Sequence, residues 1–161
     1  MSYVEFAIQM EIDGQKYYLE QAEKNKGTAL EKVFTMLAKD EEKHEALVRT
    51  YAKAVEYQLS DENAITEFKN VFKSSEAFKT ELKGMPEQID AYRMALGKEK
   101  ESIDLYQKMK EEATAEKEKT LFDYLIRQEE YHYTIFDNLV QHLRHAEEWV
   151  EDAEFGKRET Y

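Results

Sequence analysis

The sequence predicts an all-α protein, a four-helix bundle made of two αα-hairpins with a long crossover between them that contains short helix. Glycine and proline are scarce, with 5 and 1 in 161 residues, while 36% of residues are charged and 42% hydrophobic. This composition is typical of long amphipathic helices. Apolar residues recur at alternating steps of four and three along four stretches, as in helices that face a bundle core. The second half also repeats the first at an offset of 88 residues.

The first two helices form the first hairpin. Residues 2–24 are expected to be helical, and the inward-facing positions are Val4, Ile8, Glu11, Gln15, Tyr18 and Ala22. Gly27 ends this helix, and Thr28 with Glu31 has the spacing of a capping box for the next one. The inward positions of the second helix are Leu30, Phe34, Leu37, Glu41, His44, Val48, Tyr51 and Val55.

The last two helices form the second hairpin. The third is expected to start near Pro86, because proline is favoured in the first turn of a helix. Its inward positions are Tyr92, Leu96, Glu99, Ile103 and Tyr106. Those of the fourth are Phe122, Leu125, Glu129, His132, Phe136, Leu139 and Leu143. The chain is therefore predicted to be a single domain over residues 1–161, with an internal repeat of approximately 3–58 and 88–146.

Each inward-facing row is apolar except near its middle, where glutamate or glutamate and histidine replace apolar residues. The offset of 88 places Glu11 on Glu99, and the Glu41–His44 pair on Glu129–His132. An α-helix rises about 1.5 Å per residue. Measured from the predicted turn of each hairpin, the glutamate of the first helix and the Glu-x-x-His pair of the second therefore lie at the same height. Since an isolated carboxylate in a dry core costs several kcal/mol, four of them need compensation.

Two divalent cations supply that compensation. Four carboxylates balance two such ions, and two neutral imidazoles complete the set of ligands. Oxygen and imidazole donors favour iron, manganese or zinc. The predicted metal ligands are Glu11, Glu41, His44, Glu99, Glu129 and His132. We expect His44 and His132 to hold one ion each, the glutamates beside them to bridge the ions, and Glu11 and Glu99 to be terminal ligands.

Composition also bounds partners and location. The formal net charge of −12 disfavours nucleic acid and anionic membranes. No apolar run approaches the length of a membrane span and no signal peptide is recognisable, so a cytoplasmic protein is expected. The absence of cysteine excludes disulfides and thiolate ligands within these residues.

These motifs resemble the rubrerythrin branch of the ferritin-like di-iron carboxylate family, over roughly residues 3–155. The resemblance rests on Glu-x6-Tyr in both halves, on Leu-Ala-x-Asp-Glu-x-x-His ending at His44, and on Glu129-x-x-His132. The stretch Trp149–Phe155 is similar to the end of that domain. Storage ferritins usually lack the second Glu-x-x-His. The resemblance implies a ferritin-like bundle with two iron ions, which reduces hydrogen peroxide or reacts with dioxygen.

Three features depart from the family pattern. Members usually carry a rubredoxin module with cysteine-bound iron, so electrons for this chain are expected from a separate donor protein. They also carry an extra glutamate at the position of Ser102, whose repeat mate is Gly14, and we expect slower peroxide turnover without it. Finally, Asp40 precedes the ligand Glu41, whereas Gln128 precedes Glu129. An aspartate there can orient a ligand imidazole with its charge, and glutamine can only hydrogen-bond.

Several other polar residues could be structural or could support the metal site. Tyr18 and Tyr106 either pack in the bundle or donate a hydrogen bond to a ligand carboxylate on a neighbouring helix, and the recurrence favours the second reading. Glu42 and Glu130 lie about 100° from the inward row and are expected to be solvated. His142 and His145 are expected to be exposed residues near the end of the last helix.

Two segments offer partner surfaces. The stretch from Ser60 to Met85 is expected to cover the bundle with one or two short helices, or to present an apolar surface to a partner. The Trp149–Phe155 tail is expected to pack on the bundle end or on a second subunit, and a homodimer is expected.

Three functions remain open from the residues: a di-iron oxidoreductase acting on peroxide or dioxygen, an iron-handling ferroxidase, and a bundle with structural metal only.

Overall fold

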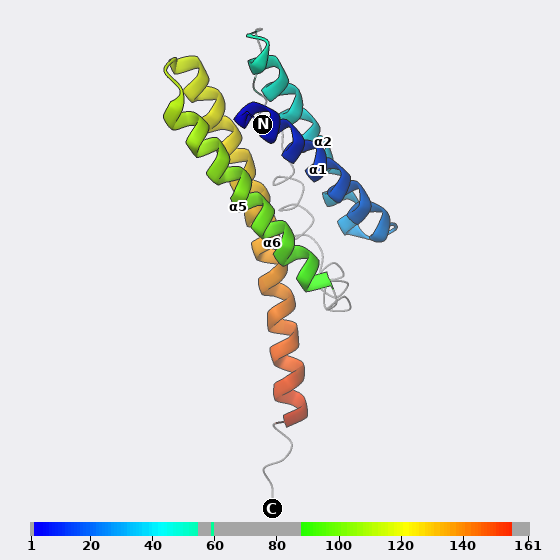
Figure 1. Ribbon diagram of the computed structural model, residues 1–161. Coiled ribbons are helices and arrows are strands. Elements are labelled where there is room, and N and C mark those ends of the chain that lie inside the picture. Colours follow the sequence, from blue (N-terminus) through cyan, green and yellow to red (C-terminus); the bar gives the residue numbers. More distant parts are fainter. Residues whose placement is uncertain (1, 55–58, 60–87, 156–161) are drawn as a thin grey trace, which may run out of the picture.

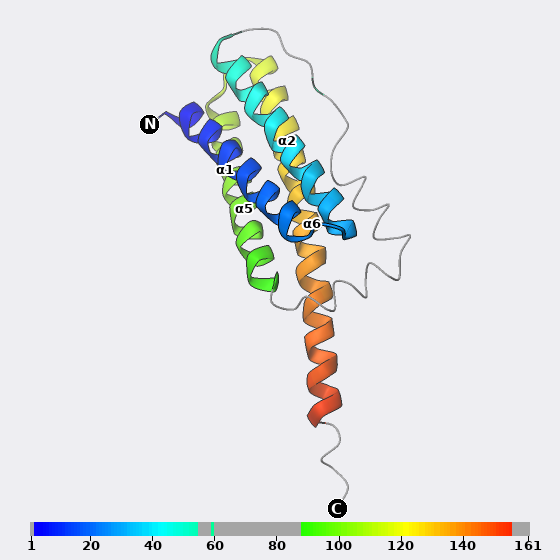
Figure 2. The same ribbon diagram turned by 90° about the vertical axis from the view of Figure 1, so that its right-hand side faces the viewer.

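The computed structural model describes residues 2–54, 59 and 88–155. Within them the chain forms four helices and no strand: α1 (Tyr3–Lys24), α2 (Ala29–Ala52), α5 (Ile89–Glu112) and α6 (Glu116–Phe155). Helices α1 and α2 form one antiparallel hairpin and α5 and α6 the other (Figures 1 and 2). The hairpins pack with α1 against α5 and α2 against α6. The prediction of an all-α four-helix bundle is confirmed.

Helix α1 begins with a capping box that the sequence analysis did not identify. The Glu5 backbone N–H donates to Ser2 Oγ at 3.2 Å, and the Ser2 backbone N–H donates to Glu5 Oε2 at 2.9 Å. These two bonds satisfy backbone donors that the first turn of a helix leaves unpaired.

The capping box predicted at Thr28 and Glu31 is wrong. Thr28 makes no side-chain cap bond, and its hydroxyl donates instead to the Asn25 carbonyl at 2.7 Å. Glu31 accepts from the Gly27 backbone N–H at 2.7 Å. Gly27 has φ +82°, a conformation that glycine adopts without strain, and this tight turn brings its N–H to the glutamate.

The buried apolar residues form two clusters, one on each side of a polar layer. The cluster toward the α1–α2 turn includes Phe34, Tyr92 and Phe136. The cluster toward the α5–α6 turn includes Tyr106 and Phe122. Burial of these aromatic side chains is the main favourable term that holds the two hairpins together. The polar layer therefore lies inside the bundle, with apolar packing above and below it.

Most positions of the inward-facing rows are buried, as predicted, and a few are only half-buried. In α1, Val4 and Ile8 are half-buried, whereas Ala7 is fully buried. In α5, Ile103 is half-buried and its neighbour Leu105 is buried. An α-helix has 3.6 residues per turn, so a strict 4-3 row rotates away from the core over several turns.

The longest helix, α6, continues past the other three (Figure 2), with 40 residues against 24 in its partner α5. The Trp149–Phe155 stretch is helical and lies in this extension. Its packing concerns side chains outside those described, and so does the prediction for His145. Helix α5 is described from Ile89, and both Pro86 and the Ser60–Met85 stretch fall outside the described residues. Among the residues that are described, no helix is long and apolar enough to cross a membrane.

Candidate metal centre

Six polar side chains form one layer between the two apolar clusters, and we call them the carboxylate–histidine layer. Its members are Glu11 on α1, Glu41 and His44 on α2, Glu99 on α5, and Glu129 and His132 on α6. None has more than 4% of its surface exposed. The structure thus brings together all six residues that the sequence analysis proposed as metal ligands.

One half of the layer surrounds the Nδ1 atom of His44. Glu129 Oε1 lies 3.0 Å from it, Glu11 Oε2 lies 3.5 Å away, and Glu41 Oε2 lies 3.9 Å away. These side chains come from three different helices, α1, α2 and α6.

The other half surrounds the Nδ1 atom of His132 in the same way. Glu41 Oε1 lies 2.9 Å from it, Glu129 Oε2 lies 3.4 Å away, and Glu99 Oε2 lies 3.7 Å away. The two imidazole rings are nearly parallel, with centroids 5.5 Å apart.

The layer therefore contains two groups of four potential ligands. Glu11, Glu41, His44 and Glu129 make up one, and Glu41, Glu99, Glu129 and His132 the other. Within each group the ligand atoms lie within 4.8 Å of one another. Glu41 and Glu129 belong to both groups, so each has one carboxylate that can bridge two ions, while Glu11 and Glu99 each serve one group.

Two tyrosines link the hairpins through the terminal carboxylates. Tyr18 on α1 donates a hydrogen bond to Glu99 Oε1 on α5, and Tyr106 on α5 donates to Glu11 Oε1 on α1. Both tyrosines are buried. Of the two readings of these tyrosines, the structure supports the hydrogen bond to a carboxylate on a neighbouring helix.

A buried aspartate orients one of the two imidazoles. Asp40 Oδ2 lies 3.1 Å from His132 Nε2. When His132 Nε2 carries the proton and donates it to Asp40, Nδ1 keeps its lone pair toward the carboxylates. Gln128, the repeat mate of Asp40, is also buried but brings no charge to the layer.

Without metal, the layer retains protons because its charges crowd together. Burial and neighbouring carboxylates raise the pKa of Glu11 well above its usual value, and they raise the pKa of Glu99 to about 8. Burial alone would lower the pKa of each imidazole, but adjacent carboxylates outweigh it and raise the pKa of His44 and His132. Burial would raise the pKa of Glu129, but the two histidines hold it well below its usual value.

The residues present fit a pair of divalent ions. Five buried atoms of the layer have no hydrogen-bond partner of suitable geometry: Glu11 Oε2, both carboxylate oxygens of Glu129, and the Nδ1 atoms of the two histidines. Buried polar atoms are normally hydrogen-bonded, and these five instead belong to two groups of close potential ligand atoms that a bound cation would satisfy. Four carboxylates and two imidazoles match the charge and the donor preference of two iron, manganese or zinc ions.

The remaining polar candidates lie apart from the layer. Glu42 and Glu130 are exposed, as predicted. His142 is half-buried, so the prediction that it is exposed is wrong; this part of α6 still packs in the bundle, where Leu143 is fully buried.

Gly14 lies beside the layer and contacts it closely, which was not predicted from the sequence. A Cβ atom at this position would lie 3.2 Å from Cδ of Glu41, a tighter contact than most Cβ atoms make, so the Glu41 side chain would have to shift slightly. The signal in the sequence was a glycine in the middle of a helix, one turn from Glu11, where glycine is otherwise unfavourable.

Comparison with known protein families identifies the family of this chain. The family model described as Rubrerythrin matches residues 2–140. No curated protein and no solved structure matches the chain significantly.

Proposed function

Because this chain belongs to the Rubrerythrin family, we propose that its carboxylate–histidine layer holds two iron ions and that the protein reduces hydrogen peroxide with electrons from a separate donor. The observation that carries the proposal is the sharing of Glu41 and Glu129 between two four-ligand groups. A shared pair of carboxylates is suited to two ions held close together, where both can act on one small molecule.

The reaction needs two electrons and two protons per peroxide. The O–O bond breaks and two water molecules form; two ferrous ions held by the carboxylate–histidine layer would supply one electron each. These 161 residues contain no cysteine, so they hold no thiolate-ligated iron centre that could return the electrons. In this proposal the electrons come from a redox centre outside these residues, and dioxygen is the alternative oxidant.

The side chains around the layer have distinct tasks in this proposal. His44 and His132 hold one ion each, and Asp40 fixes the orientation of His132 by accepting from its Nε2–H. The hydroxyls of Tyr18 and Tyr106 hold the terminal carboxylates on the opposite hairpin. Together these bonds limit the movement of the ligands when the charge of the centre changes.

Stopped-flow oxidation of the anaerobic diferrous protein tests the proposal. We expect hydrogen peroxide to oxidise the bound iron faster than dioxygen does, with two ferrous ions converted to ferric ions per peroxide. Sustained turnover is expected only after addition of a reduced redox protein. Ser102 stands where the family has a further glutamate, so we expect turnover slower than that of family members that carry it.

Other results would redirect the assignment. A faster reaction with dioxygen would contradict peroxide as the substrate and leave an oxygen-using oxidase or ferroxidase. Iron accumulating well beyond two ions per chain would indicate storage. No reaction with either oxidant, with two metals bound, would leave a structural site.

A further inference from the structure

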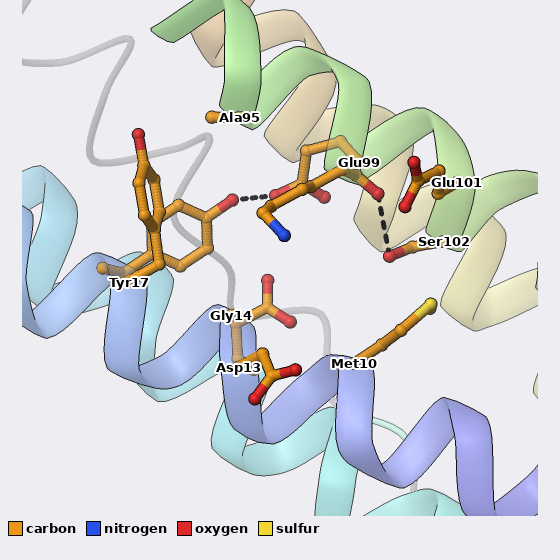
Figure 3. A pocket seen from close by; sticks show the side chains of 11 residues that line it. Met10, Asp13, Gly14, Tyr17, Ala95, Glu99, Glu101 and Ser102 are labelled. Atoms are coloured by element: carbon orange, nitrogen blue, oxygen red, sulfur yellow. Dashed lines mark hydrogen bonds between the residues drawn. The ribbon is translucent and has the colours of Figure 1, made fainter. Parts of the chain in front are cut away.

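A pocket between α1 and α5 reaches the carboxylate–histidine layer from outside. Its volume is about 60 Å³. Figure 3 shows Gly14 and Met10 on α1 facing Glu99 and Ser102 on α5 across this space. Glu41 also lines the pocket, so two members of the layer form part of its wall.

The pocket leads to one half of the layer in particular. Glu41 and Glu99 both belong to the group around His132, and Glu99 is the member that serves this group alone. The Tyr18 ring lines the same pocket and donates its hydrogen bond to Glu99. A molecule in the pocket would therefore lie beside the His132 half of the layer.

Two small residues keep this path open. Gly14 and Ser102 occupy equivalent positions in the two repeats, 88 residues apart, and they line the pocket from opposite helices. At Gly14 even a methyl group would press on Glu41. The Ser102 hydroxyl donates to the Lys98 carbonyl of its own helix at 3.2 Å, and is thereby held against α5.

The size and charge of the pocket restrict what it can admit. By the measure in which one water needs roughly 10–15 Å³, its volume of about 60 Å³ admits a few water-sized molecules. Two acidic residues, Asp13 and Glu101, line it together with a single cation, Lys98. Outside the carboxylate–histidine layer the lining thus has one more carboxylate than cation, which disfavours anions and is compatible with a small uncharged molecule.

We propose that this pocket is the path by which a small uncharged oxidant reaches the metals, and that Gly14 and Ser102 set the size limit for it. The proposal rests on the proposed function for the identity of the oxidant. Hydrogen peroxide and dioxygen fit the space, and we expect organic peroxides with bulky alkyl groups to pass Gly14 and Ser102 more slowly.

The test narrows the pocket without changing a ligand. Ser102→Leu fills the space beside Glu99, and Ser102→Ala removes only the hydroxyl. Thr35→Leu is the matched control, because Thr35 is also half-buried and donates to the carbonyl four residues before it, but lies on α2 outside the pocket lining. Each protein is loaded with two ferrous ions, its metal content is measured, and nitric oxide binding is followed by stopped-flow absorbance.

We expect Ser102→Leu to keep two iron ions and to bind nitric oxide at least tenfold more slowly. Thr35→Leu should match the parent protein, and Ser102→Ala, which does not narrow the pocket, should bind nitric oxide at least as fast as the parent protein. In the parent protein, tert-butyl hydroperoxide should oxidise the iron at least tenfold more slowly than hydrogen peroxide. Because nitric oxide binding needs no peroxidase activity, it reports on access even if the proposed reaction is wrong. Unchanged nitric oxide binding in Ser102→Leu with two irons bound would overturn the proposal. The proposal would also be overturned if Ser102→Leu slowed the uptake of ferrous iron but not the binding of nitric oxide, because the pocket would then be a path for metal.

Discussion

At the scale of single residues, Glu41 and Glu129 have a different position from the other ligands. Both lie in each of the two potential metal groups, whereas Glu11 and Glu99 each lie in one. Removing a shared carboxylate takes a ligand from both ions, and removing a terminal one takes a ligand from one ion. The contribution of each glutamate to metal binding therefore follows from its place in the layer.

Alanine substitutions test this difference. Glu41→Ala is expected to lower the metal content from two ions per chain to less than one, and Glu11→Ala to about one. Glu42→Ala is the matched control and is expected to keep two ions, because its side chain is exposed. Elemental analysis after gel filtration gives the result. Equal losses in all three variants would contradict the assignment of the inward-facing row.

Asp40 makes the two halves of the layer unequal. It accepts from His132, while the equivalent residue in the other half is the neutral Gln128. Loss of a carboxylate that orients a ligand histidine typically costs 10–100-fold in metal affinity. We expect Asp40→Asn to weaken one of two binding steps by about that factor, as measured by calorimetric titration with Co²⁺. An unchanged isotherm would show that Asp40 does not support a metal ligand.

At the scale of helices, Gly14 in α1 and Gly97 in α5 form a natural pair for comparison. Each lies inside a helix of more than 20 residues, where replacing glycine by alanine normally stabilises by about 1 kcal/mol. Nothing lies within 4 Å of a Cβ at Gly97, whereas one at Gly14 meets Glu41. The same substitution should therefore have different consequences in the two helices.

We expect Gly97→Ala to raise the melting temperature and to leave metal affinity unchanged. Gly14→Ala should weaken metal binding, because Glu41 must move, and its gain in stability should be smaller in the metal-loaded protein than in the metal-free one. Thermal unfolding with and without metal, together with a metal titration, separates these effects. Matching behaviour of the two variants would show that Glu41 does not depend on the space at Gly14.

The spacing of apolar residues predicts which residues of a helix face the core, but it does not predict how the helices pack against one another. The bounds of α1 and the inward positions of Glu41, His44, Glu129 and His132 follow from the 4-3 spacing and the repeat. Contacts across the bundle, such as Asp40 with His132, depend on how the hairpins pack, which the spacing does not specify. The capping box predicted at Thr28 was wrong because Glu31 accepts from the backbone N–H of Gly27 instead. Which N–H of this turn reaches the glutamate depends on the backbone angles, which the spacing does not specify.

At the scale of the whole molecule, the buried layer makes stability depend on pH. In the metal-free protein the pKa of Glu99 is about 8, against 4.5 for an exposed glutamate, and the pKa values of Glu11 and both histidines are raised as well. The folded state then binds more protons than the unfolded state in this range. Groups of this kind contribute stability that is complete below the unfolded pKa and is lost as pH rises through the folded pKa.

We therefore expect the melting temperature of the chelated protein to fall between about pH 4.5 and pH 8. Glu129 has the opposite shift, and its contribution is lost only toward more acidic pH. Metal replaces the protons, so the loaded protein should keep its melting temperature as pH rises and should release metal in acid. Parallel pH profiles for the two forms would contradict a metal-binding layer.

The central claim is that this layer holds two metal ions per chain. Anaerobic calorimetric titration of the chelated, folded protein with ferrous iron at neutral pH tests it most directly. We expect saturation at two ions per chain, with a rise in melting temperature on loading. Saturation at one ion, or no measurable binding, would contradict it.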